Sequence, residues 1–163
     1  AGRDALRRLE PDVLLDVVTR SVAVKLDTVA ADEQDHGVRQ ALNFGHTIGH
    51  ALERVTDYAL GHGHAVAVGM CVEADAAARA GLLDEPTRDR LLQVLEELGL
   101  PTRLPADVDR SALWDGLRLD KKNRGGEVRF ALPARVGEIA SFGGRYSTTL
   151  PDDALRQALE ARS

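Results

Sequence analysis

The chain has 163 residues, 44% of them hydrophobic, and a formal net charge of −5 at pH 7. This length suffices to bury a core without disulfides, and the acidic balance excludes the basic surface typical of nucleic-acid-binding domains. The one cysteine, Cys71, excludes a disulfide framework and fits a reducing compartment. No apolar run approaches the roughly 20 residues of a membrane span, and the first residues are not a signal peptide. We expect one cytoplasmic domain that binds neither nucleic acid nor membrane.

The first long pattern predicts a helix from Pro11 to about Ala30. Proline is favoured in a first helical turn, and apolar residues then recur at helical spacing, which predicts one buried face. Lys25 lies within this helix, where a lysine side chain is normally solvated. The polar residues 31–37 end in glycine and predict a loop that exposes His36.

Four of the five histidines lie in residues 39–64. His46 and His50 are four residues apart in an apolar pattern of helical period, so both imidazoles should project from one helix face. A glycine-rich turn over 58–64 then brings His62 and His64 back toward that face. Neutral imidazoles suit zinc and similar divalent ions. The cluster predicts a metal site, although any one histidine taken alone is more often a satisfied or solvated side chain.

The residues just before the histidines extend this face. Arg39, Asn43, His46 and His50 follow one another at intervals of four, three and four. Side chains at such intervals are neighbours on a helix. The spacing therefore predicts one helix that carries all four side chains on the same side.

The rest of the chain predicts three helices, a hairpin and a terminal helix. The helices are expected at 65–80, at 84–98, and from Asp109 or Ser111 to Leu119. Residues 120–126 form a cationic glycine-rich loop, which is either a phosphate or carboxylate receptor or simply a solvated turn. Residues 127–132 and 136–142 predict paired strands around a turn at 133–135. The expected fold over residues 1–163 is mainly α, a multi-helical domain with one small β-hairpin near the C-terminus.

Four segments resemble, in order and spacing, the carboxy-terminal half of 3-dehydroquinate synthase. They are VKLDTVAADE (24–33), LNFGHTIGHALE (42–53), HGHAVAVGM (62–70) and LDKKNRGGEVRFALP (119–133). The resemblance implies a sugar-phosphate cyclase, a lyase that uses NAD and a divalent metal, zinc (or cobalt). It implies conversion of 3-deoxy-D-arabino-heptulosonate 7-phosphate into 3-dehydroquinate and phosphate, in the shikimate route to aromatic amino acids.

The matching motifs also imply the roles of particular residues. His46 and His62 are implied as two of three metal ligands. The substrate's hydroxyls, carboxylate and phosphate would be held by Lys25, Arg39, Asn43, His50 and Lys121. The chemistry suits these roles, because a guanidinium pairs with a carboxylate, an ammonium with phosphate and an amide with hydroxyls.

The chain also departs from the family pattern. The third metal ligand, a glutamate in an upstream Gly-Leu-Ala-Glu-Val-Ile-Lys-like segment, has no counterpart here, and no glycine-rich nucleotide-binding fingerprint appears. We therefore expect the NAD-binding α/β half to be missing and the chain alone to be inactive. Its implied partners are that N-terminal half, the sugar-phosphate substrate and a second copy in a homodimer. His64 stands where the family commonly has glutamate, a change we expect to be tolerated.

Two other readings remain open. Sister cyclases that act on sedoheptulose 7-phosphate or glucose 6-phosphate share the metal histidines, although the intact set of substrate residues favours dehydroquinate synthase. The second alternative is a non-catalytic metal-binding helical module.

Overall fold

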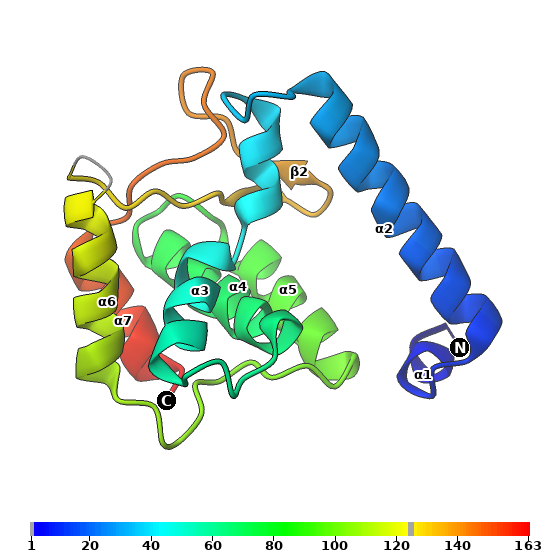
Figure 1. The fold of residues 1–163 in the computed structure, drawn as a ribbon, viewed down its shortest axis with the longest axis horizontal. Helices are drawn as coiled ribbons and strands as arrows, with labels where there is room; N and C mark the ends of the chain where they lie inside the picture. The colour runs from blue at the N-terminus through cyan, green and yellow to red at the C-terminus, as the bar shows by residue number, and fades with distance from the viewer. Residues whose placement is uncertain (1, 124–125) are drawn as a thin grey trace.

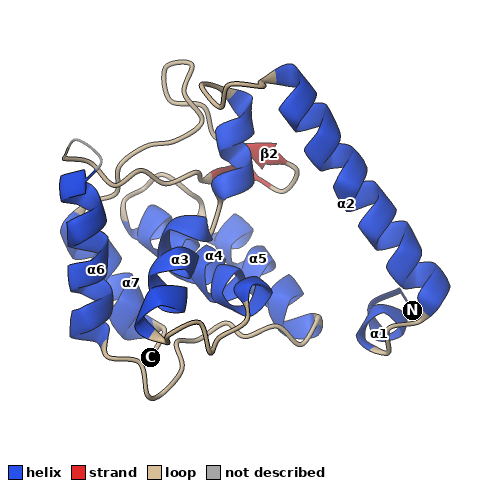
Figure 2. Ribbon diagram, viewed as in Figure 1, coloured by secondary structure: helices blue, strands red, loops and turns tan. Residues whose placement is uncertain are grey.

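The structure is a computed structural model that describes residues 2–123 and 126–163, without the side chains of residues 119–123. It is mainly helical with one small two-stranded antiparallel sheet, which confirms the expected fold class (Figure 1, Figure 2). The elements are α1 (Gly2–Arg7), α2 (Pro11–Ala31), the 3-10 helix η1 (Val38–Asn43), α3 (His46–Val55), α4 (His62–Arg79), α5 (Glu85–Glu97), α6 (Arg110–Asn123), β1 (Pro133–Arg135), β2 (Glu138–Ile139) and α7 (Asp152–Ala161). Within the described residues, none of the helices combines the length and the apolarity needed to span a bilayer.

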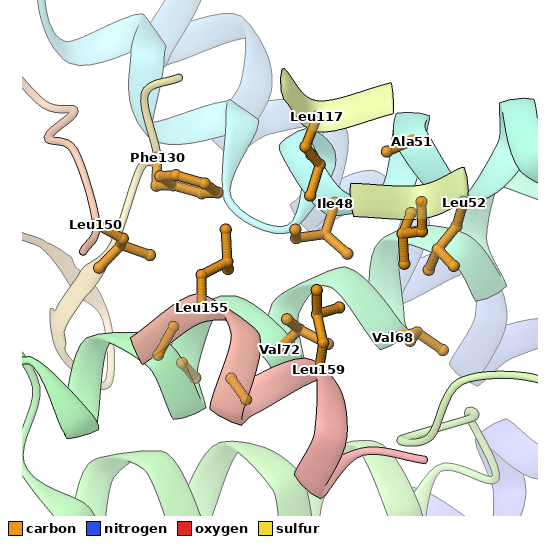
Figure 3. Close-up of a cluster of buried hydrophobic side chains, with 14 of the residues drawn as sticks. Ile48, Ala51, Leu52, Val68, Val72, Leu117, Phe130, Leu150, Leu155 and Leu159 are labelled. Carbon is orange, nitrogen blue, oxygen red and sulfur yellow. The ribbon is translucent and has the colours of Figure 1, made fainter. Parts of the chain in front are cut away.

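Helix α4 is the centre of the fold, with α3, α5 and α7 packed around it (Figure 1). Its sequence is rich in alanine and glycine, so neighbouring helices can approach closely. Val68 and Val72 of α4 meet Ile48 of α3 and Leu159 of α7 in the main apolar cluster (Figure 3). Phe130, from the segment before the hairpin, closes the cluster and is 1% exposed. The core therefore fixes α3 against α4, the two helices that carry the histidine cluster.

The residue before helix α3 is a glycine that no other residue could replace. Gly45 has φ +80°, and a Cβ there would lie 2.4 Å from Cγ of Met70 and 2.7 Å from the carbonyl oxygen of Val66. The buried carboxyl group of Glu73 on α4 accepts hydrogen bonds from the amides of Gly45 (2.8 Å) and Ile48 (3.1 Å). It thereby satisfies donors that a helix N-terminus leaves unpaired. Burial raises the pKa of Glu73 to about 8, although these amides act in the opposite direction.

This break corrects the expectation of one helix through Arg39, Asn43, His46 and His50. Arg39 and Asn43 lie on η1, whereas His46 is the first residue of α3. The apolar spacing continues across the break, but the left-handed turn at Gly45 changes the direction of the chain. Only Asn43 therefore remains beside the two histidines.

Helix α2 has the expected bounds, but its predicted buried face is wrong for this chain. None of its residues is buried, and Val18, Val22 and Leu26 are 49%, 49% and 62% exposed. The helix contacts α1 and η1 and runs apart from the bundle (Figure 1). Helical periodicity identifies an apolar face but not the surface that covers it.

Downstream boundaries differ from the expected ones in two places. The glycine-rich turn expected over 58–64 ends earlier, because His62 already begins α4. Helix α5 begins as expected, where Asp84 accepts a hydrogen bond from the amide of Thr87 at 2.8 Å. Asp109 caps α6 through the amide of Ser111, but the backbone stays helical to Asn123. Residues 120–123 are therefore a helix end rather than the expected loop.

The hairpin is present, but its strands are shifted along the chain. Pro133, expected in the turn, begins β1 and pairs with Ile139, while Gly137 at φ +83° makes the turn. Proline is tolerated at the start of an edge strand because it has no amide to pair. The expected strand 127–132 instead forms a single bridge, in which the amide of Phe130 donates to the carbonyl of Thr148 at 2.7 Å.

Candidate metal and substrate site

Three histidine rings come together where α3 meets the first turn of α4. His46 and His50 project from α3, and His62 is the first residue of α4. The ring centroids are 5.3 Å apart for His46 and His62, 5.4 Å for His46 and His50, and 5.9 Å for His50 and His62. Rings at these separations are close enough to share one cation. His64 is exposed two residues further on and is not part of this three-ring contact.

Two of these rings have their Nδ1 atoms engaged by fixed acceptors. Nδ1 of His46 lies 3.2 Å from the carbonyl oxygen of Phe44, and Nδ1 of His62 lies 3.1 Å from Oε1 of Glu53. A carbonyl or carboxylate oxygen can only accept, so Nδ1 carries the proton in each ring. The Nε2 atoms are then left with lone pairs, which is the arrangement that metal-ligating histidines usually show.

Glu53 is a carboxylate at this site that the sequence analysis did not single out. One ligand atom each from His50, Glu53 and His62 lie within 4.8 Å of one another. Glu53 follows His50 by three residues, so helical spacing alone could have placed both on one face. Because Glu53 already engages Nδ1 of His62, we assign it the role of orienting that ring.

The donor set fits a zinc or cobalt ion. Imidazole nitrogens and a carboxylate oxygen are the usual protein ligands of zinc, and catalytic zinc sites commonly use three protein ligands. His46 and His62 would supply two through Nε2. His50 is neutral near pH 7, because partial desolvation lowers its pKa and the nearby His46 lowers it further. Among the described residues, the ligand atoms that lie within 4.8 Å of one another belong to His50, Glu53 and His62, whereas His46 approaches His50 and His62 through ring contacts.

The orienting role of Glu53 gives a quantitative expectation. Replacing Glu53 with glutamine keeps the shape but removes the charge that favours the proton on Nδ1 of His62. Zinc affinity should fall about 10- to 100-fold, measured by competition with a chelator. Glu85, an exposed acid at the start of α5, is the matched control, and Glu85→Gln should leave the affinity unchanged. An affinity within twofold of the parent chain for Glu53→Gln would remove Glu53 from the site.

A cavity of about 340 Å³ adjoins the histidines. Its walls come from the η1 region, from α3 and from the segments before and after the hairpin. The lining residues are Asp35, Gln40, Asn43, His46, Thr47, His50, Arg54, Val128, Arg129, Ala131 and Ser147. The structure thus brings Asn43, His46 and His50 together at one cavity.

Two predicted substrate residues, Lys25 and Arg39, do not line this cavity in the described part of the chain. Lys25 lies on the exposed helix α2, and Nη1 of Arg39 donates to the carbonyl of Glu33 at 3.0 Å. Neither is among the described residues that line the cavity. The side chain of Lys121 lies outside the described part of the chain. The roles of these three residues stay predictions.

The cavity also contains polar residues that the sequence analysis missed. Arg54 projects from the end of α3, while Arg129 and Ser147 come from segments 75 residues or more beyond it. Arg54 follows His50 by four residues, a spacing that could have indicated a shared face. No local pattern could have placed Arg129, because its position depends on how the hairpin region packs on α3.

The fold is shared with solved proteins of one class. Two solved sugar-phosphate cyclases share this architecture. A 2-deoxy-scyllo-inosose synthase complexed with carbaglucose-6-phosphate, NAD+ and Co2+ matches with a TM-score of 0.82 and 23% identity, over 94% of this chain and 42% of that one. The 2-epi-5-epi-valiolone synthase of Streptomyces hygroscopicus, with NAD+ and Zn2+ bound, matches with a TM-score of 0.76 and 24% identity, over 98% and 43%. The chain therefore has the fold of the helical part of a sugar-phosphate cyclase.

The particular family follows from sequence. Residues 2–123 match the model of the 3-dehydroquinate synthase C-terminal family, and the chain belongs to this family. The 3-dehydroquinate synthase of Nostoc punctiforme is 40% identical over 158 residues, which are 96% of this chain. The chain spans 42% of that relative's length. These matches confirm the resemblance to the carboxy-terminal half of the synthase.

Proposed function

We propose that this chain is the metal- and substrate-binding half of a 3-dehydroquinate synthase. The reaction would convert 3-deoxy-D-arabino-heptulosonate 7-phosphate into 3-dehydroquinate and phosphate, as a cytoplasmic step of the shikimate pathway. The observation that carries the proposal is the convergence of His46, His50 and His62 beside a polar cavity. Membership of the synthase family supports the choice of this reaction.

The chain's own residues would hold the reacting groups. His46 and His62 would present Nε2 to the metal, and Glu53 would fix the orientation of His62. Asn43, whose amide both donates and accepts, suits the substrate's hydroxyls. His50 lines the same cavity and, being neutral, can accept a proton there. A bound zinc or cobalt ion would supply Lewis-acid polarisation of the hydroxyl that loses hydride to NAD.

The NAD-binding half is proposed as a partner of this chain. The chain spans less than half of its relatives, and helix α2 exposes Leu15, Val18, Val22 and Leu26. A row of exposed apolar side chains is typical of a surface that another domain or subunit covers. We propose that the nucleotide half covers α2, that the isolated chain does not turn over, and that the complete enzyme is a homodimer.

An assay of the complete gene product tests the proposed reaction. With NAD and zinc present, phosphate release should be fastest from 3-deoxy-D-arabino-heptulosonate 7-phosphate, and the 163-residue chain alone should release none. Sedoheptulose 7-phosphate and glucose 6-phosphate are the competing substrates, because the structural neighbours include cyclases of other products. Faster release from either would reassign the substrate, and tight zinc binding without turnover on any of the three would indicate a non-catalytic module.

A further inference from the structure

Arg129 lines one wall of the cavity, and hydrogen bonds hold its guanidinium in place. Nε of Arg129 donates to Oγ of Ser147 at 3.0 Å, and Nη2 donates to the carbonyl of the same serine. The carbonyl of Arg129 accepts a hydrogen bond from Oγ1 of Thr47 on α3, also at 3.0 Å. The backbone of this arginine is therefore tied to the helix that carries His46 and His50, and its guanidinium is tied to the segment after the hairpin.

The hydrogen-bond acceptors on this wall are already paired with donors from the same wall. Ser147 is buried, and its hydroxyl accepts from Arg129 and donates to Oε1 of Gln40 at 2.8 Å. Because Oε1 of Gln40 is turned toward Ser147, its amide nitrogen is the group left to donate, and its bond to the carbonyl of Asp35 is long, at 3.4 Å. What this wall can offer a ligand is thus hydrogen-bond donors.

The charges of the residues that line the cavity also favour an anionic ligand. Arg54 and Arg129 contribute two positive charges and Asp35 one negative charge. Glu127 lies 3.3 Å from Nη1 of Arg129, but it is largely exposed, so water and salt screen this pair. Among the described residues, Ser147 and Glu127 engage three of the five guanidinium N–H groups. A positively charged, donor-rich wall suits an anion.

We propose that Arg129 binds the acidic group of the substrate, a phosphate or carboxylate, beside the histidine cluster. A planar guanidinium donates two parallel hydrogen bonds to such a group, which an ammonium cannot do. Ser147, which is itself bonded to Gln40, pre-orients the guanidinium, so little side-chain freedom is lost on binding. The inference rests on the proposed function, since it takes the acidic group to belong to the sugar phosphate. It adds an anion-binding residue from the segment before the hairpin.

Binding of inorganic phosphate to the 163-residue chain tests this directly. Phosphate is titrated into the parent chain and into Arg129→Gln, Arg129→Lys and Arg135→Gln, with amide NMR shifts of residues 47 and 147 as the readout. Arg129→Gln should weaken binding about 10-fold or more, the usual effect of losing a charged hydrogen-bond partner. Arg129→Lys keeps the positive charge but cannot donate two parallel hydrogen bonds. Its phosphate affinity should therefore lie between those of Arg129→Gln and the parent chain. Arg135 is exposed on the hairpin and paired with Glu138, so Arg135→Gln should leave the phosphate affinity unchanged.

The outcomes separate this inference from the proposed function. If the parent chain binds no phosphate, or if Arg129→Gln binds it as well as Arg135→Gln does, the inference is overturned. If Arg129→Gln does not fold, Arg129→Lys provides the test. A phosphate affinity of Arg129→Lys equal to that of the parent chain would mean that the two parallel guanidinium hydrogen bonds have no role. Zinc binding is measured on the same samples: a parent chain that binds phosphate but no zinc would count against the histidine site and leave Arg129 as an anion ligand. In the complete enzyme, Arg129→Gln should raise KM for the sugar phosphate about 10-fold or more.

Discussion

Replacing either His46 or His62 with alanine should abolish zinc retention. Each ring has its Nδ1 proton held by a fixed oxygen, so each substitution removes one Nε2 lone pair from the site. Loss of a direct ligand should exceed the 10- to 100-fold effect that is typical of losing an orienting partner. Zinc content after dialysis against a chelator measures the retention. Turnover by the complete enzyme should fall with it.

His64 is the matched control for these variants. It lies in the same first turn of α4 as His62 but is exposed and outside the three-ring contact. His64→Ala should retain zinc and activity, as expected if a histidine is tolerated where the family commonly has glutamate. If His46→Ala keeps its zinc while His50→Ala loses it, the ligands would be His50, Glu53 and His62 instead.

Gly69→Ala should destabilise the chain by about 3 kcal/mol or more, at the upper end of overpacking effects. A Cβ at Gly69 would lie 2.0 Å from the carbonyl oxygen of Gly45 and 2.9 Å from the amide nitrogen of Gly49. Both are backbone atoms of the α3 region and cannot rotate away. Helix α3 would have to shift away from α4, which would also move His46 away from His62. Urea denaturation measures the free energy of unfolding, and zinc retention reports the shift.

Gly116 in α6 provides the comparison. A Cβ there meets nothing within 4 Å, so Gly116→Ala should be neutral or stabilise the helix by up to about 1 kcal/mol. If Gly69→Ala unfolds at the same urea concentration as Gly116→Ala, the close contact between α3 and α4 would be contradicted.

The predictable parts of the fold are those that local sequence determines. Helix α5 begins where it was expected, because the capping contact of Asp84 spans only three residues. The break before α3 was not predictable, since the carboxyl group that stabilises it belongs to Glu73, on another helix. The turn of the hairpin is expected at 133–135 because of Pro133, whereas Gly137 makes the turn later in the chain. For α2, periodicity indicated an apolar face but not its partner.

The same division applies to the candidate site. His46 and His50 share a helix face because they are four residues apart, which the sequence shows directly. Their approach to His62 follows from the glycine-permitted contact between α3 and α4. The spacing also predicts Arg39 on this helix face, but Arg39 lies on η1, before the turn at Gly45. Arg129 reaches the cavity only through tertiary contacts with Thr47 and Ser147, so no spacing rule could identify it.

Anomalous diffraction at the zinc edge from crystals grown with zinc tests the metal site most directly. We predict one peak about 2.0–2.1 Å from Nε2 of both His46 and His62, the usual zinc–imidazole distance. Arg129 should line the neighbouring cavity in the same crystals. A zinc ion bound without His46, or no zinc at the junction of α3 and α4, would contradict the shared metal site.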